Sequence, residues 1–178
     1  MIAFLFETVG QARAVGLRAV IVVLAAASSA AAQDLDAFLP AAGGWETYMN
    51  SRFGMSFDYP AEIFVPEAQP TNGDGRTFRA DDASLQIYAF QNIENETPAS
   101  LERRLVGAEG YENVTYSPSG SGWLVLSGFR GDTIFYEKYL FRGGIIAAFG
   151  TEFPTVRKPF YAPIVERIED SFRAERSG

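Results

Sequence analysis

The spacing of hydrophobic residues along this chain changes several times, and each change indicates a different element. From Phe53 to Tyr59 the apolar residues alternate with polar or small ones, so a strand would place Phe53, Met55 and Phe57 on one face. Pro60 ends this strand because proline cannot donate a hydrogen bond to a ladder. The same reasoning predicts further strands at 45–49, 77–80, 84–91, 112–117, 122–129, 133–141 and 144–153.

One segment in the middle of the chain has the signals of a capped helix. Thr97 suits the N-cap and Pro98 the first helical position, while Leu101 and Leu105 fall four residues apart on one face. The glycine-containing segment 107–110 ends this predicted helix.

A second helix is predicted near the end of the chain, over 158–173. Pro159 and Pro163 are tolerated only within or before the first turn, so the regular part is expected to begin near Ala162. Its apolar stripe repeats at four-residue steps and consists of Phe160, Ile164, Ile168 and Phe172.

The order of these elements predicts a fold class. Several strands, a helix, four strands joined by short turns and a closing helix are typical of an α+β domain, with an antiparallel β-sheet flanked by helices. We expect one such domain, over residues 45–174.

The first 32 residues have the layout of a secretory signal peptide. Arg13 and Arg18 precede an apolar run, and small residues at 30–32 suit a signal peptidase. The alternative is an uncleaved anchor, but the most apolar part, 19–27, is far shorter than the roughly 20 residues of a spanning helix. We therefore expect cleavage near Ala32, no stable membrane anchor afterwards, a periplasmic or secreted protein, and an N-terminal arm at 33–44.

The composition excludes much chemistry. The chain has no histidine and no cysteine, so a nucleophilic serine lacks its usual base, and zinc and haem lack their usual ligands. We expect no enzyme activity, no cofactor and no metal; a carboxylate-based hydrolase is the remaining enzymatic alternative. The net charge of −7 and the absence of a basic cluster argue against nucleic acid as a partner.

Oxygen ligands gather in one stretch, which raises calcium as an alternative. Asn72, Asp74, Asp81 and Asp82 lie within eleven positions of one another, but Arg76 occupies the fifth position of an EF-hand counted from Asn72. Asn-Gly and Asp-Gly pairs also favour turns, so a structural turn is the preferred interpretation.

Two motifs resemble a known family. "RFGMSFDYPAEIF" (52–64) is similar to the GFSF-x-YP signature near the start of PsbP-like domains, and "TEFP" followed by a helix ending "IVERIEDSF" resembles their closing segment. Met55 stands where that family more often has an aromatic residue, and Phe64 where it has tryptophan. The resemblance implies an α/β/α sandwich and a binding or scaffolding domain without shared catalytic residues.

Together these features predict a non-catalytic binding or scaffolding domain. Its partner would be an unknown protein or, alternatively, a small apolar ligand. The loop 66–76 is the expected contact region because connecting loops often carry function. Asn72, Asp74 and Arg76 are the candidate binding residues within it.

Overall fold

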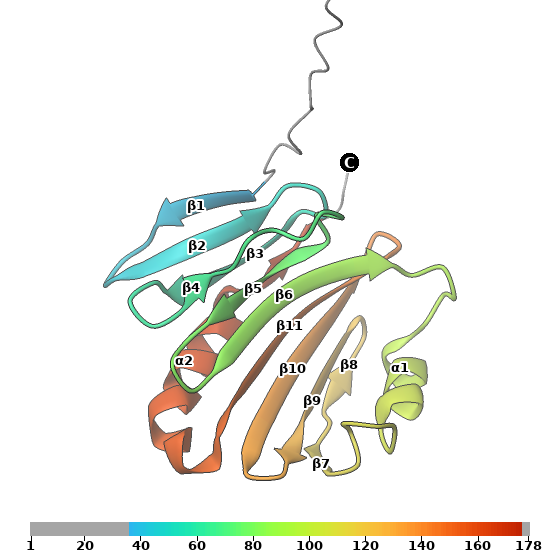
Figure 1. Cartoon of the computed structure of the whole chain (residues 1–178). Helices are drawn as coiled ribbons and strands as arrows, with labels where there is room; N and C mark the ends of the chain where they lie inside the picture. Colours follow the sequence, from blue (N-terminus) through green and yellow to red (C-terminus); the bar gives the residue numbers. More distant parts are fainter. Residues whose placement is uncertain (1–35, 176–178) are drawn as a thin grey trace, which may run out of the picture. The chain divides into compact units, whose positions relative to one another are not determined.

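The computed structural model describes residues 36–175, and the predicted signal segment lies outside them. Two antiparallel sheets and two helices make up this described part (Figure 1). A search of its helices finds none with the length and apolarity that crossing a membrane requires.

The smaller sheet contains the N-terminal strands and a short C-terminal one. Its strand order is β1-β2-β3-β12. β1 falls within the segment expected as an arm and pairs with β2 along its whole length. The bounds are β1 Asp36–Pro40, β2 Trp45–Asn50, β3 Met55–Pro60 and β12 Arg173–Ala174.

The larger sheet has the order β4-β5-β6-β11-β10-β9-β7, and β8 pairs with β9 off this path. Its two longest strands, β10 and β11, form a hairpin whose turn uses Gly143 and Gly144 at φ 56° and 83°, values that favour glycine. The bounds are β4 Val65–Pro66, β5 Gly75–Arg79, β6 Ser84–Gln91, β7 Val114–Tyr116, β8 Ser119–Gly120, β9 Trp123–Arg130, β10 Thr133–Arg142 and β11 Ile145–Pro154.

The first helix, α1 (Pro98–Leu105), begins where the sequence predicts. The Thr97 hydroxyl accepts from the Ser100 amide at 3.2 Å, and the Ser100 hydroxyl accepts from the Thr97 amide at 2.8 Å, which completes a capping box. Leu101 is buried against the larger sheet.

The second helix, α2 (Lys158–Ser171), follows a 3-10 turn at Thr155–Arg157. It begins four residues before Ala162, so Pro163 lies inside it. Pro163 has no amide hydrogen, so it cannot donate the backbone hydrogen bond to the preceding turn of the helix. Because Pro163 is exposed, the missing bond lies on the solvent side of α2.

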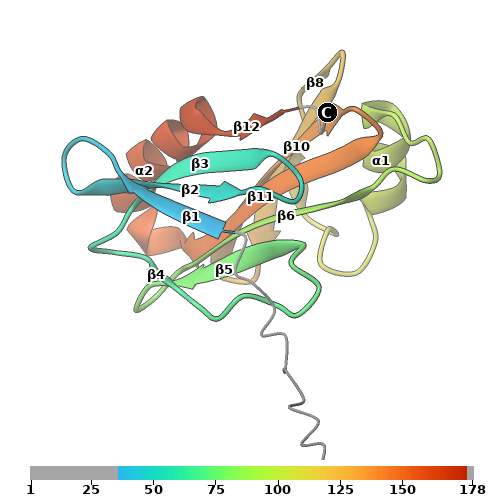
Figure 2. The ribbon, with the colours of Figure 1, turned by 90° about the horizontal axis from the view of Figure 1, so that it is seen from above.

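The predicted fold class, an antiparallel β-sheet flanked by helices in an α/β/α sandwich, is wrong. The fold is β-rich: the face of the larger sheet opposite α1 is covered by the smaller sheet together with α2 (Figures 1 and 2). The physical reason is that α2, a single helix of 14 residues, is too narrow to bury this whole face of the larger sheet. The smaller sheet buries the part that α2 leaves open.

The aromatic residues of the opening strands form the core between the two sheets. Tyr48, Phe57 and Tyr59 surround Phe78 of the larger sheet, with ring centroids 5.5, 5.5 and 4.7 Å from it. All four side chains are at most 1% exposed. The strand face to which the alternation assigned Phe57 therefore forms a wall of the core.

We predict that Phe78→Ala lowers the free energy of unfolding by about 3–5 kcal/mol, because it opens a cavity at the centre of this ring cluster. Denaturant titration followed by circular dichroism measures the loss. Val156→Ala, at a position 86% exposed, is the control and should change stability by less than about 0.5 kcal/mol. Equal stability of the two variants would contradict the assigned role of the ring cluster.

Candidate functional site

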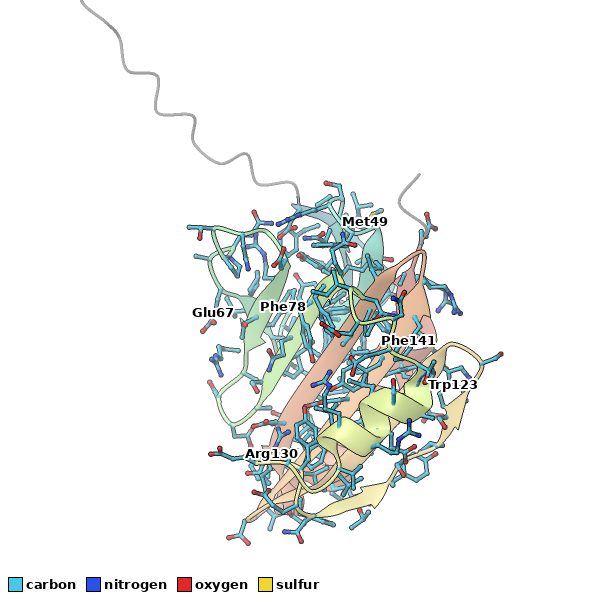
Figure 3. All side chains as sticks on the ribbon, turned by 90° about the vertical axis from the view of Figure 1, so that its right-hand side faces the viewer. Met49, Glu67, Phe78, Trp123, Arg130 and Phe141 are labelled. Carbon is cyan, nitrogen blue, oxygen red and sulfur yellow. The ribbon has the colours of Figure 1, made fainter. Side chains whose placement is uncertain are left out.

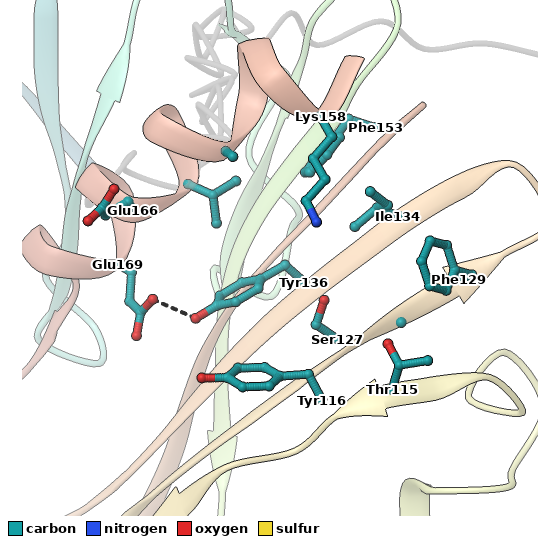
Figure 4. A pocket seen from close by; sticks show the side chains of 13 residues that line it. Thr115, Tyr116, Ser127, Phe129, Ile134, Tyr136, Phe153, Lys158, Glu166 and Glu169 are labelled. Atoms are coloured by element: carbon teal, nitrogen blue, oxygen red, sulfur yellow. Dashed lines mark hydrogen bonds between the residues drawn. The ribbon is translucent and has the colours of Figure 1, made fainter. Parts of the chain in front are cut away.

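A groove of about 430 Å³ lies between α2 and the outer strands of the larger sheet (Figure 4). Strands β9, β10 and β11 form its floor, α2 forms one wall and β7 forms the other. The lining residues are Thr115, Tyr116, Ser127, Gly128, Phe129, Ile134, Tyr136, Phe153, Lys158, Ala162, Val165, Glu166 and Glu169.

The strand register explains why these side chains share one face. Ile134 pairs with Phe129 and Tyr136 pairs with Ser127, so both pairs point to the α2 side. The ladder between β7 and β9 shifts its register before Tyr116, which pairs with Ser127. This irregularity lets consecutive residues of β7 both line the groove.

The groove combines an apolar floor with exposed rings at its rim. Ile134, Phe153 and Val165 are at most 8% exposed, whereas Phe129 is 40% and Tyr116 is 56% exposed. Apolar surface left exposed beside a concave floor is a feature of binding sites.

The charged groups of the groove differ in their pairing. Glu169 accepts from the Tyr136 hydroxyl at 2.5 Å and pairs with the Lys138 ammonium at 2.9 Å. Burial, together with this bond to Glu169, raises the pKa of Tyr136, so its hydroxyl stays protonated. Lys158 has no ion pair or hydrogen bond to another side chain in 36–175, and Figure 4 shows its ammonium directed into the groove.

The candidate residues Asn72 and Asp74 lie together in the loop between β4 and β5. The side-chain amide of Asn72 donates to one Asp74 carboxylate oxygen at 2.9 Å, and Arg52 pairs with the other oxygen at 2.6 Å. The Asp74 amide also donates to the Asn72 side chain at 3.3 Å. Such bonds stabilise a turn, in line with the preferred interpretation of this segment.

The third candidate, Arg76, is separated from this exposed loop. It lies in β5, and its side chain is 7% exposed. Its Nε donates to Asp36 at 2.8 Å, its Nη1 donates to the Glu67 carbonyl at 2.9 Å, and the group lies over the Phe38 ring. Arg76 therefore joins the two sheets.

The possible calcium ligands are also apart. Asn72 and Asp74 precede β5, whereas Asp82 follows it and pairs with Arg157 at 3.2 Å. Five extended residues separate the two ends by roughly 16 Å. Within residues 36–175 no group of three or more acidic side chains is placed to hold a metal ion.

Two carboxylates on the α1 face lie close together, which bears on the hydrolase alternative. The Arg130 guanidinium pairs with both Glu137 and Glu152. Tyr111 and Tyr139 donate their hydroxyls to Glu137, the former at 2.7 Å. Figure 3 shows Arg130 near one end of α1, and its Nε donates to the Gly110 carbonyl beyond the helix. Both carboxylates therefore have partners within the fold: Glu137 in an ion pair and two hydrogen bonds, and Glu152 in an ion pair.

The arrangement of two sheets and two helices matches a solved structure. Cyanobacterial PsbP (CyanoP) from Synechocystis sp. PCC 6803 superposes with a TM-score of 0.58, covering 77% of this chain and 99% of that one. The fold is PsbP-like. The two sequences are 14% identical, so the resemblance seen in the sequence is confirmed at the level of the fold. No family model and no curated protein matches the chain.

Sequence reasoning missed the groove of this PsbP-like fold. Phe129 follows the alternation of a buried strand, and only the absence of a covering element exposes it. Lys158 offered a weak signal as one of two lysines in the chain. The groove residues of β7, β9 and β10 that lie near it are 22 to 43 positions earlier in the chain, which spacing alone does not reveal.

We predict that Arg76→Ala lowers the free energy of unfolding by about 3 kcal/mol, because the fully buried Asp36 carboxylate loses a charged partner. Asn72→Ala, in the exposed loop, should change it by less than about 0.5 kcal/mol. Chemical denaturation of both variants measures the difference. An Arg76→Ala protein as stable as Asn72→Ala would show that the ion pair does not join the sheets.

We predict that the protein loses stability as the pH rises from about 10 to about 12. Burial, and then its bond to Asp82, raises the pKa of Tyr161 to about 12, against about 10 in the unfolded chain. In this window the unfolded state has released a proton that the folded state keeps, so the free energy of unfolding falls; below pH 10 the contribution is complete. Denaturation at several pH values should give a shallower slope for Tyr161→Phe, and an unchanged slope would contradict this assignment.

Proposed function

We propose that the protein is an exported, periplasmic, non-catalytic binding domain whose binding surface is the groove beside α2. This proposal rests on the exposed rings of Phe129 and Tyr116, which lie beside the apolar floor of the groove. The PsbP-like fold supports a binding role by the resemblance drawn from the sequence. Export rests on the signal-like segment 1–32.

Two kinds of occupant are compatible with this surface. The open rim, with Tyr116 and Phe129 exposed, supports docking of a partner protein, because aromatic side chains often anchor interfaces. The volume of about 430 Å³ supports a small apolar ligand, since small-molecule sites commonly enclose about 300–1,000 Å³.

A pull-down with the tagged full chain, expressed in its own host, tests the proposed surface. Phe129→Glu places a charge on the apolar rim and should reduce a captured partner, or a ligand detected by native mass spectrometry, at least tenfold. The matched control is Asn72→Ala with Asp74→Ala, which changes the exposed loop and should leave capture unchanged.

Circular dichroism confirms that both variants are folded before capture is compared. Equal capture by wild type and Phe129→Glu would contradict the groove as the binding surface. Loss of capture in the loop variant alone would transfer the binding role to the loop 66–76. A wild-type protein that retains neither a partner nor a ligand would contradict the binding function itself.

A further inference from the structure

One cation of the groove forms no ion pair with any other residue in the range 36–175. Lys158 is the first residue of α2, and Figure 4 shows its ammonium directed toward the space above the floor strands. It is neither ion-paired nor hydrogen-bonded to another side chain across the described residues. Its charge is therefore available to an occupant.

The two acidic side chains of the groove, Glu166 and Glu169, form no ion pair with Lys158. Glu169 is engaged by Lys138 and by the Tyr136 hydroxyl. The Glu166 carboxylate lies well away from the Lys158 ammonium in Figure 4. Lys158 thus places an available positive charge at one end of the groove, although the chain as a whole carries −7. Glu166 also has no ion pair among residues 36–175, but it lies apart from this end. Repulsion from distant acids is screened beyond about 8–10 Å at physiological salt, so the local charge decides which group binds.

The remainder of the groove suits an apolar body. Ile134 and Phe153 supply the floor, and Val165 supplies apolar surface on the α2 wall. Phe129 adds an exposed ring at the rim. A stable protein interface buries roughly 800 Å² on each partner, whereas exposed large apolar side chains among the groove residues are limited to Phe129 and Tyr116. A small molecule fills a site of about 430 Å³ without needing further surface.

We infer that the groove binds a small amphiphilic carboxylate, with the carboxylate at Lys158 and the apolar body on Phe129, Ile134 and Val165. The inference rests on the proposed function, since it requires the groove to be the binding surface. It adds the class of ligand: a medium-length organic acid rather than a neutral or cationic amphiphile. Each CH₂ group buried on the floor should tighten binding about fourfold until the groove is full.

Calorimetry with the purified full chain at pH 7.5 tests this selectivity. The probes are dodecanoate, dodecanol and dodecyltrimethylammonium, used below their aggregation concentrations. Dodecanoate should bind at least tenfold more tightly than dodecanol, because it adds an ion pair to the same apolar contact, and the cation should bind most weakly. Octanoate should bind more weakly than dodecanoate, which measures the contribution of the apolar body.

Three variants locate the contact. Lys158→Met keeps an unbranched side chain that is one atom shorter and removes its charge; it should lower the affinity for dodecanoate about tenfold and leave dodecanol unchanged. Arg103→Gln removes one positive charge from an exposed position on α1 and should change neither affinity. Phe129→Glu should abolish binding of both probes.

The outcomes separate this inference from the proposed function. Equal binding of dodecanoate and dodecanol, unaffected by Lys158→Met but lost in Phe129→Glu, would overturn the carboxylate class and support the groove as a binding surface. Binding that survives Phe129→Glu would place the ligand elsewhere and overturn the inference. If none of the probes binds, the inference is overturned, and the pull-down decides the proposed function independently.

Discussion

The central constraint on this structure is that both faces of its larger sheet must be buried. Along β10, Ile134 and Leu140 point to one face while Phe135 and Tyr139 point to the other, and all four contribute to apolar clusters. β11 repeats this pattern with Ile145 to Phe149, all at most 5% exposed. Strands that are apolar on both sides need a cover on each side, and the remaining elements supply it.

On the face opposite α1, the covering elements are together narrower than the larger sheet, and this difference creates the groove. Seven strands at about 4.8 Å spacing make a sheet roughly 34 Å wide, whereas a helix covers only about 10 Å. The four-stranded smaller sheet adds roughly 19 Å beside α2, so a strip near β7 and β9 remains uncovered. The exposed rings of Tyr116 and Phe129 lie on this strip.

The elements that the sequence predicted well have local causes. The start of α1 follows from Thr97 and Pro98, which act through their own backbone and through Ser100. The strands from 84 to 153 follow from alternation and glycine turns. β1 carries no comparable signal, because its order depends on pairing with β2 and on the Arg76–Asp36 ion pair, whose partners lie 40 positions apart.

The candidate site shows the same division between local and tertiary causes. Asn72 and Asp74 are polar residues in a turn, and they occupy one, as their types favour. Arg76 looks equally available in the sequence, yet its side chain is buried among groups contributed by β1 and by the loop that follows β4. The sequence shows the type of each residue, but it does not show which segments the packing of the two sheets brings into contact.

The groove beside this strip also gives Lys158, the first residue of α2, a mixed environment. Lys158 follows the end of β11 after one 3-10 turn, and this exposed side chain lines the groove, so it lies beside both water and apolar surface. Lysine suits such a boundary because its long aliphatic part contacts apolar surface while its ammonium remains hydrated. A ligand that enters the groove displaces that water, and a carboxylate replaces the lost hydration of Lys158 whereas an alkyl chain alone does not. The geometry that leaves the strip uncovered therefore also sets the selectivity inferred for it.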